Sequence, residues 1–316
     1  MGKIHAAITG VGAYLPDYVL TNDELSRMVD TNDEWITTRV GIKERRIEKD
    51  PNRPASYMGI KAVENLFART KTNPEEIDLV ICATSTPDHI FPATAAIIAE
   101  ACSIKNALCF DIQAACSGFL AAYTIASNFI ESGQKKKILV VSTEKMSYMV
   151  DYTDRSTCPL FGDGAGALLI EPNDEGYGLI DSEMLTDGAG VPYLEMKAGG
   201  SAKPASHESV DAHEHFVYQE GKVVFKHAVT NMCKTTADVM ARNNLTGEDV
   251  KWLIPHQANL RIIEAVGQRV EVPTEKIFIN IQKYGNTSSA TVPICLWEMQ
   301  NNGQLKKGDK IVTVGG

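Results

Sequence analysis

The sequence predicts an α/β protein with two similar halves. Short apolar runs rich in β-branched residues, typical of buried strands, alternate with longer segments of helical periodicity. Alternation of this kind favours strands and helices packed in layers. The length of 316 residues exceeds that of an ordinary single core, and a weak internal repeat runs through the chain. Together these observations favour two related domains over one large domain.

The expected elements follow one another along the chain. Buried strands are expected at "IDLVICAT" (77–84), "ALCFDI" (107–112), "KILVVST" (137–143), "KWLIP" (251–255), "KIFINI" (276–281) and "KIVTVG" (310–315). Helices are expected at 55–70, 92–103, 117–132, 223–243, 258–270 and 288–302. The segment "KAGGSAKPASHESVDAHEHF" (197–216) has little periodicity and is expected to be a surface excursion.

Two pairs of segments, in the same order, carry the repeat. "ARTKTNPEEIDLVI" (68–81) matches "ARNNLTGEDVKWLI" (241–254) at an offset of 173, and "DIQAACS" (111–117) matches "NIQKYGN" (280–286) at an offset of 169. Each match lies at a junction between a strand and a helix, and two ordered matches support duplication better than one. We therefore expect a boundary near residue 172, with halves at 1–172 and 173–316.

Charge and cysteine content argue against several classes of protein. The 40 acidic and 31 basic residues give a net charge of -9, which argues against a general binder of nucleic acid or of membrane surfaces. The seven cysteines are scattered without a CxxC pair, so neither a disulfide framework nor a zinc site is expected. No apolar run reaches the ~20 residues that span a bilayer, and the amino terminus lacks the apolar core of a signal peptide. A cytoplasmic location fits these features best.

Cys116 in "FDIQAACSGFLAA" (110–122) is the first candidate for chemistry. It stands between an expected strand and an expected helix, among small residues that permit a sharp turn. A thiol at a helix amino terminus meets unpaired N–H groups and the positive end of the helix dipole, both of which favour the nucleophilic thiolate. The alternative is a core cysteine, because free cysteine is among the most buried residue types.

His256 and Asn286 occupy comparable positions in the other half. His256 follows strand 251–255, and Asn286 follows strand 276–281. Considered alone, His256 could be a structural histidine and Asn286 a turn residue or helix cap. Ligands of α/β sheets bind beyond the carboxyl ends of the strands, where such junctions gather. Cys116, His256 and Asn286 could therefore meet in one site.

Five blocks in order carry a resemblance to a known family. They are "VDTNDEWITTRVGIKERR" (29–46), "AACSGF" (114–119), "FGDGAGA" (161–167), "PHQANLRI" (255–262) and "YGNTSSA" (284–290). They closely resemble beta-ketoacyl-acyl carrier protein synthase III, the condensing enzyme that starts type II fatty acid synthesis. The likeness runs from about residue 8 to the end. It implies a duplicated thiolase-like fold, five-layered αβαβα with two mixed sheets.

The resemblance also implies an activity and its catalytic residues. Cys116 would take an acyl group, acetyl in the simplest case, from acyl-CoA. His256 and Asn286 would donate hydrogen bonds to the enolate oxygen that forms when malonyl-acyl carrier protein loses carbon dioxide. The enolate carbon would then attack the acyl-Cys116 thioester. CoA is a substrate in this reaction, and neither a cofactor nor a metal is expected.

The resemblance extends to binding residues. Trp35 and Arg155 match residues that bracket the CoA adenine, and Arg39 lies nearby for phosphate. The pantetheine tunnel is matched by Phe225, Ala258 and Asn259, and the surface for the acidic carrier protein is matched by Arg261, Lys226 and Arg269. Phe91 matches a residue that reaches the partner's acyl pocket across a dimer interface, so a homodimer is expected.

Two other motifs invite a functional interpretation that the sequence does not favour. "FGDGAGA" lacks the GxxxxGK[ST] lysine and hydroxyl of a phosphate-binding loop and fits close backbone packing at a turn. The spacing of His207, His213 and His215 fits no standard metal site, and a mobile loop is expected there.

The sequence departs from the family at its carboxyl end. It stops at Gly315-Gly316, where the family continues into a final strand that carries an oxyanion-hole amide, so the sequence is expected to be shortened or incomplete. Two rival functions stay open. One is a related condensing enzyme of secondary metabolism with another acyl donor or acceptor, and the other is a non-catalytic scaffold that binds acyl groups or CoA.

Overall fold

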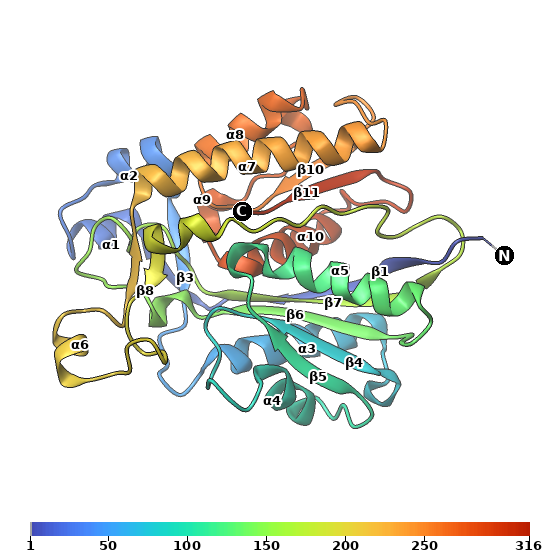
Figure 1. Cartoon of the computed structure of the whole chain (residues 1–316), viewed down its shortest axis with the longest axis horizontal. Coiled ribbons are helices and arrows are strands. Elements are labelled where there is room, and N and C mark those ends of the chain that lie inside the picture. Colours follow the sequence, from blue (N-terminus) through green and yellow to red (C-terminus); the bar gives the residue numbers. More distant parts are fainter. Residues whose placement is uncertain (1) are drawn as a thin grey trace.

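The computed structural model describes residues 2–316 (Figure 1). The strands are β1 (His5–Tyr14), β2 (Tyr18–Thr21), β3 (Glu44–Ile47), β4 (Leu79–Ala83), β5 (Leu108–Ile112), β6 (Ile138–Glu144), β7 (Gly164–Asn173), β8 (Leu194–Met196), β9 (Val217–Gln219), β10 (Trp252–Pro255) and β11 (Ile311–Val314). The α-helices are α1 (Asn22–Ser26), α2 (Asp33–Val40), α3 (Ala55–Thr70), α4 (Thr94–Ala101), α5 (Gly118–Glu131), α6 (His207–Asp211), α7 (Gly221–Arg242), α8 (Leu260–Arg269), α9 (Ile281–Tyr284) and α10 (Thr291–Asn301).

A mixed sheet of five strands forms the centre of the amino-terminal half, in the order β1-β7-β6-β4-β5. Strand β4 pairs in parallel with β5 and β6, whereas β7 pairs antiparallel with β1 and β6. Every residue of β4 and β6 is buried, because helices cover both faces of the sheet. This double cover explains why these strands are uninterrupted apolar runs in the sequence.

Helices cover the two faces of this sheet in separate layers. Helix α3 packs on β1, β6 and β7 on one face, while α5 and α10 pack on the opposite face. The buried side chains of α3 include Met58, Ala62 and Leu66, which recur every four residues along one side of the helix. The apolar periodicity of 55–70 therefore becomes the contact between helix and sheet.

The carboxyl-terminal half adds a second sheet above α5 and α10. Strands β10 and β11 pair in parallel, α10 also contacts β10, and α7 packs on β11 and on α8. From top to bottom, Figure 1 shows α7 with α8, then β10 with β11, then α10 with α5, then the five-stranded sheet, then α3 with α4. The predicted αβαβα layering is confirmed.

Most predicted elements appear close to their expected bounds, but one predicted strand is wrong. The segment 276–281 contributes only an isolated bridge, Leu253 with Ile277, and then turns into α9. The backbone N–H groups of Asn280 and Ile281 both donate to the side-chain Oε1 of Gln257, at 3.1 and 3.2 Å. A buried side chain therefore satisfies the donors that a longer strand would have used.

Three segments contain secondary structure beyond the strands and helices expected above. Strands β1 and β7 pair along their length and were not among the expected strands. The segment 197–216 lies largely on the surface as predicted, but it contains α6, whose amino end is closed by a capping box between Ser206 and Ser209.

Candidate active site

Cys116 lies in a 3₁₀ turn, η2 (Ala115–Ser117), between β5 and α5, which confirms its predicted position. The turn is sharp, because Ala115 has a positive φ of 46°. Gly118 opens α5 at a crowded point: a Cβ atom there would lie 3.1 Å from the Cβ atoms of both Ala83 and Ser289. The small residues around Cys116 therefore let the turn approach the neighbouring chain segments.

The polar neighbours of the Cys116 sulfur come from the 286–288 segment. The hydroxyl of Ser288 lies 3.8 Å from Sγ, and the side chain of Asn286 also hydrogen-bonds the sulfur. Loss of water around the half-buried thiol nevertheless raises its pKa to about 11, and Glu144 acts in the same direction when it is ionised. Hydrogen bonds from Ser288, Asn286 and the Cys116 backbone act to lower the pKa of the thiol. The predicted preference for thiolate therefore stays a prediction.

Asn286 is held by its backbone. Its N–H donates to the carbonyl of Leu160 at 2.9 Å, and its carbonyl accepts from the N–H of Gly162 at 3.0 Å. The side-chain Oδ1 accepts from the N–H of Ser288 at 2.8 Å, which leaves the amide N–H groups free to face the thiol. The residue is buried, so its donors are directed into the protein interior.

His256 lies at the end of β10 and is almost completely buried, with 1% of its surface exposed. Its backbone N–H donates to the carbonyl of Val314 in β11 at 2.7 Å, and its Nδ1 lies 2.6 Å from Oγ1 of Thr291. Within residues 2–316, its Nε2 has no hydrogen-bond partner. Burial lowers the pKa of the imidazole to about 4, so the ring is neutral at physiological pH.

The segments that carry these three residues contact one another. Turn η2, which contains Cys116, packs on η6 (Ser288–Ala290), two residues after Asn286. Gly315, one residue beyond the Val314 carbonyl that holds His256, is so close that a Cβ atom on it would lie 3.5 Å from the Cys116 carbonyl oxygen. The structure therefore brings together the three segments that carry Cys116, His256 and Asn286, which are distant in the sequence.

The predicted adenine-binding residues gather near the start of α2. Trp35 keeps 39% of its surface exposed, and the guanidinium of Arg39 lies over its ring at 4.9 Å. Arg155 reaches the same region, where its Nη1 lies 3.0 Å from the carboxylate of Asp30. An indole face and two arginines are thus available on one exposed surface.

The residues predicted for the pantetheine tunnel lie between α7 and α8. Phe225 on α7 is half-buried, and the guanidinium of Arg261 on α8 lies 5.1 Å from its ring centre. Ala258 and Phe225 both pack against the same buried apolar cluster. Asn259 caps α8, because its Oδ1 accepts from the N–H of Arg261 at 2.9 Å. The sequence did not show this capping role.

The residues predicted to contact protein partners are exposed. Arg261, Lys226 and Arg269 are solvent-exposed on the adjacent helices α7 and α8. Phe91 is 84% exposed and stands beside Ile90, which is 89% exposed. Two neighbouring apolar side chains so open to water are unusual on a folded monomer.

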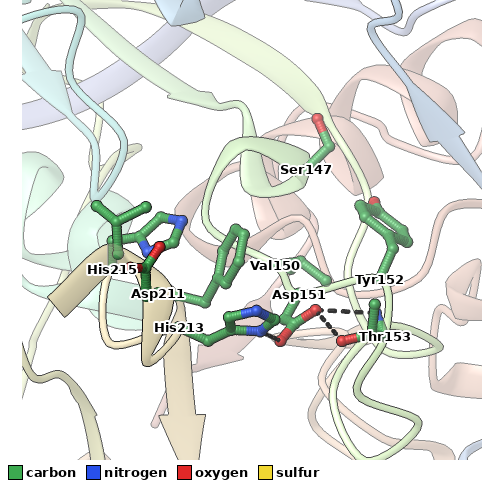
Figure 2. A pocket seen from close by; sticks show the side chains of 10 residues that line it. Ser147, Val150, Asp151, Tyr152, Thr153, Asp211, His213 and His215 are labelled. Carbon is green, nitrogen blue, oxygen red and sulfur yellow. Dashed lines mark hydrogen bonds and ion pairs between the residues drawn. The ribbon is translucent and has the colours of Figure 1, made fainter. Parts of the chain in front are cut away.

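An open pocket of about 730 Å³ lies away from Cys116, His256 and Asn286 (Figure 2). It is lined by residues of 147–153 and 210–216. Figure 2 shows the ring of His213 directed at the carboxylate of Asp151, with Nδ1 and Oδ2 2.7 Å apart. Residues 2–316 present no group of three or more His, Cys, Asp or Glu arranged to hold a metal ion.

The glycine-rich motif 161–167 is structural, as the sequence analysis favoured. A Cβ atom on Gly162 would lie 2.4 Å from the carbonyl oxygen of Tyr284, and one on Gly166 would lie 2.3 Å from Cβ of Pro293. The carboxylate of Asp163 is buried and accepts from the backbone N–H groups of Glu48 and Ser147. The motif therefore packs the first sheet against the segment that carries Asn286.

No helix in the described part of the chain is long and apolar enough to cross a membrane.

Comparison with known proteins gives the same result across the whole chain. The profile described as 3-oxoacyl-[acyl-carrier-protein (ACP)] synthase III matches residues 110–188, and the profile of its C-terminal part matches residues 240–316. The chain is 56% identical over 312 residues to beta-ketoacyl-[acyl-carrier-protein] synthase III 1 of Bacteroides thetaiotaomicron, covering 99% of this chain and 92% of that relative.

Solved structures agree with the sequence matches. The crystal structure of 3-oxoacyl-[acyl-carrier-protein] synthase III from Aquifex aeolicus matches with a TM-score of 0.89 and 42% identity, covering 98% of this chain and 94% of that one. The priming beta-ketosynthase of the R1128 polyketide biosynthetic pathway matches with a TM-score of 0.90 and 34% identity, covering 98% and 92%. The fold, the arrangement of the site and the extent of these matches show that the chain belongs to the beta-ketoacyl-acyl carrier protein synthase III family.

Proposed function

We propose that this chain is an acyltransferase that initiates type II fatty acid synthesis by condensing an acyl-CoA primer, acetyl-CoA, with malonyl-acyl carrier protein. Identity of 56% to a beta-ketoacyl-[acyl-carrier-protein] synthase III over nearly the whole chain supports this activity. The observation that carries the site assignment is a thiol that the Asn286 carboxamide hydrogen-bonds, with a buried neutral imidazole whose Nε2 has no partner in the described chain on the adjoining segment. A cytoplasmic location is part of this proposal.

The first half of the proposed reaction is transfer of the acyl group to Cys116. The sulfur attacks the thioester carbonyl of acyl-CoA, the bond to the CoA sulfur breaks, and the thiol proton leaves with CoA as its free thiol. Burial disfavours thiolate at Cys116, as the pKa of about 11 shows. Hydrogen bonds from Ser288 and Asn286 act in the opposite direction, so they stabilise the sulfur as negative charge develops on it.

The second half is decarboxylative condensation. The malonyl group loses carbon dioxide, and the electron pair of the broken bond forms an enolate whose oxygen needs hydrogen-bond donors. The enolate carbon attacks the acyl-Cys116 carbonyl, the carbon–sulfur bond breaks, and the sulfur takes up a proton from solvent, which replaces the one that left with CoA. The product is a beta-ketoacyl-acyl carrier protein. The protein's own side chains supply the donors, and the proposal includes no cofactor or metal.

His256 and Asn286 are the proposed donors to the enolate oxygen. The oxygen of Thr291 accepts from the N–H of Gln257 at 3.3 Å, so its single proton is available for Nδ1 of His256. That arrangement places the proton of the neutral ring on Nε2, the atom without a partner. A buried donor without an acceptor is costly, and a substrate oxygen would satisfy it.

The remaining proposed contacts bind the parts of the substrates that lie farther from the reacting atoms, namely CoA and the carrier protein. Trp35 and Arg155 stack on the CoA adenine, with Arg39 for phosphate, because planar aromatic and guanidinium groups both stack on a base. Phe225, Ala258 and Asn259 line the pantetheine tunnel. The exposed cations Arg261, Lys226 and Arg269 receive the acidic carrier protein, which suits a basic patch on a protein of net charge -9.

A homodimer is the proposed assembly. Strand β5 forms one edge of the five-stranded sheet, and Leu108 on this strand is 51% exposed. Ile90 and Phe91, which precede α4, are more exposed still. An unpaired apolar edge invites strand pairing, and two copies of one edge can pair antiparallel around a twofold axis. In this dimer, Phe91 enters the partner's acyl pocket.

Acyl-enzyme analysis tests the proposed function. The protein is incubated with labelled acetyl-CoA and then with malonyl-acyl carrier protein, while mass spectrometry follows both the label on Cys116 and the product. We expect an acetyl adduct on Cys116 that disappears as a four-carbon beta-ketoacyl-acyl carrier protein forms. Absence of the adduct in the natural protein would favour the non-catalytic scaffold and contradict the proposal.

A second condensing function rests on the match to a priming beta-ketosynthase of a polyketide pathway. Such an enzyme would use the same cysteine with another acyl donor or acceptor. An adduct on Cys116 that malonyl-acyl carrier protein fails to discharge would support this alternative. A panel of acyl-CoAs, compared by the mass shift of the intact protein, identifies the donor.

A further inference from the structure

Glu144 is a carboxyl group buried in the core directly behind the proposed site. It ends β6, and none of its surface is exposed. Its Oε1 lies 2.6 Å from Oγ of Ser289, and its Oε2 lies 3.3 Å from Oγ1 of Thr86. The backbone N–H of Ser85 also donates to the carboxyl group, at 3.0 Å from Oε1 and 3.2 Å from Oε2. Glu144 thereby joins three chain segments that are remote in sequence.

The hydrogen-bond count shows which form of Glu144 fits this environment. The Ser289 hydroxyl has one proton but lies within reach of two oxygens, the carbonyl of Ala83 at 3.2 Å and Oε1 of Glu144 at 2.6 Å. If Glu144 is ionised, the Ser289 hydroxyl can donate its proton to only one of these two oxygens. The other contact then joins two acceptors with no proton between them. If Oε1 carries a proton, it donates to Ser289, which in turn donates to Ala83, and every group is satisfied.

The other carboxyl oxygen is consistent with this assignment. The oxygen of Thr86 already accepts from the N–H of Lys145 at 2.8 Å, so its proton is available to Oε2 of Glu144. One carboxyl oxygen thus accepts from Thr86, while the other carries the proton that Ser289 accepts. The neutral acid completes a chain of hydrogen bonds from β6 to η6.

The charged groups around Glu144 also favour the neutral form. The titratable groups that face it are Cys82 on β4, Cys116 on η2 and Asp163 just before β7, none of which is a cation. Lys145, the next residue, directs its ammonium group to two backbone carbonyls instead. Burial is the largest cause that raises the pKa of Glu144 to about 8.

Ser289 links the Glu144 carboxyl group to the segment that contacts Cys116. It belongs to η6, which packs both on β6 and on the Cys116 turn, and its neighbour Ser288 contacts the sulfur. Resting on the function proposed above, we propose that Glu144 is a positioning residue: held as a neutral acid, it donates to Ser289 and keeps the Asn286–Ser289 segment against Cys116. Ionised Glu144 would loosen this contact and place a negative charge behind the thiol.

Infrared spectroscopy tests the protonation state without any substrate. The difference spectrum between the natural protein and Glu144→Gln isolates the Glu144 carboxyl from other buried acids such as Asp163. We expect a protonated-carboxyl band at pH 7 that is lost as pH rises through about 8. A carboxylate band at pH 7 in its place would overturn the proposal.

Alkylation of Cys116 by iodoacetamide tests the coupling to the thiol. Raising pH increases the thiolate fraction in both proteins, but only the natural protein gains a second negative charge at residue 144. At pH 9 we expect Glu144→Gln to react about threefold faster than the natural protein, from Coulomb repulsion alone. Equal rates at every pH would contradict the coupling.

Condensation kinetics test the positioning role. Glutamine can donate to Ser289 and accept from Thr86, so Glu144→Gln should condense within about threefold of the natural rate at pH 7. Glu144→Ala and Ser289→Ala should each lower kcat by about tenfold with little change in KM, as expected when one buried partner is removed. Equal kcat values for the Gln and Ala variants would refute positioning.

Failure of the natural protein to condense would contradict the proposed function alone, because the infrared and alkylation results decide on Glu144 independently.

Discussion

At the scale of single residues, Cys116 and Asn286 have separable tasks. Cys116→Ala should abolish acyl transfer but retain some malonyl decarboxylation, because both enolate donors remain. Asn286→Ala should lower decarboxylation by about 100-fold or more, the usual cost of one oxyanion donor, while Cys116 still accepts an acyl group. Labelled malonyl-acyl carrier protein measures release of carbon dioxide, and mass spectrometry measures acylation. Equal loss of both activities in either variant would contradict this division.

The buried imidazole of His256 makes a prediction about acid stability. Its pKa is about 4 in the folded protein and 6.5 in the unfolded chain, so between these values the unfolded chain binds more protons. His256 therefore lowers the free energy of unfolding as pH falls from 6.5 to 4, by up to about 3 kcal/mol. Glu144 acts in the opposite sense, because its pKa is raised from 4.5 in the unfolded chain to about 8 in the folded protein. Its contribution to the free energy of unfolding is therefore fully present below pH 4.5 and is lost as pH rises through 8.

Urea unfolding at pH 4.5 and pH 7 measures the His256 contribution. The comparison of the natural protein with His256→Gln cancels the opposing effect of Glu144. Lowering the pH from 7 to 4.5 should reduce the unfolding free energy of the natural protein more than that of the variant, because only the natural protein carries His256. A difference that is independent of pH would show that His256 is not buried as a neutral ring.

At the scale of elements, the buried Arg45 on β3 fixes the segments behind the Asn286 turn. Its guanidinium donates to the carbonyl of Leu20 at 3.1 Å, to Oδ1 of Asn22 at 2.9 Å and to the carbonyl of Pro159 at 2.8 Å. None of its surface is exposed, and no carboxylate pairs with it in the described chain. Its role is therefore to satisfy buried acceptors that β2, α1 and the turn at Pro159 bring together.

Arg45→Ala should lower the free energy of unfolding by about 3 kcal/mol or more, because these acceptors become unsatisfied and a cavity remains. The matched control is Arg27→Ala, which removes an arginine whose side chain is 70% exposed and which forms a surface ion pair with Asp23. Denaturant unfolding of both variants provides the comparison. Similar losses in the two variants would mean that the buried contacts do not stabilise the fold.

The elements also show what the sequence could and could not predict. The 223–243 periodicity anticipated α7 within two residues at each end, because one side of that helix is apolar and the other polar. The predicted strand at 276–281 failed because Gln257, which is close only in the fold, takes its donors. The position of Cys116 was visible in the sequence, but the burial that raises its pKa depends on η6, some 170 residues away.

At the scale of the whole molecule, the site is built between two halves. Cys116 comes from the turn that follows β5 of the five-stranded sheet, whereas His256 follows β10 and Asn286 follows α9. All strands of the five-stranded sheet lie within 5–173. The boundary near residue 172 stays a prediction. It is supported by the sheet topology, because β7 is the last strand of the five-stranded sheet and the later strands β10 and β11 form a separate sheet.

The proposed dimer predicts that the β5 edge controls assembly. Leu108→Arg places a charge on the exposed face of this edge strand, where it would be buried between two copies without a partner. We expect the variant to elute as a monomer in size-exclusion chromatography with light scattering, while the natural protein elutes as a dimer. Ile180→Arg is the control, because Ile180 is 58% exposed but lies outside every strand and helix. If Phe91 completes the partner's acyl pocket, the Leu108 variant also loses acylation of Cys116 at protein concentrations where the control retains it. A Leu108 variant that stays dimeric and fully active would show that this edge is not the interface.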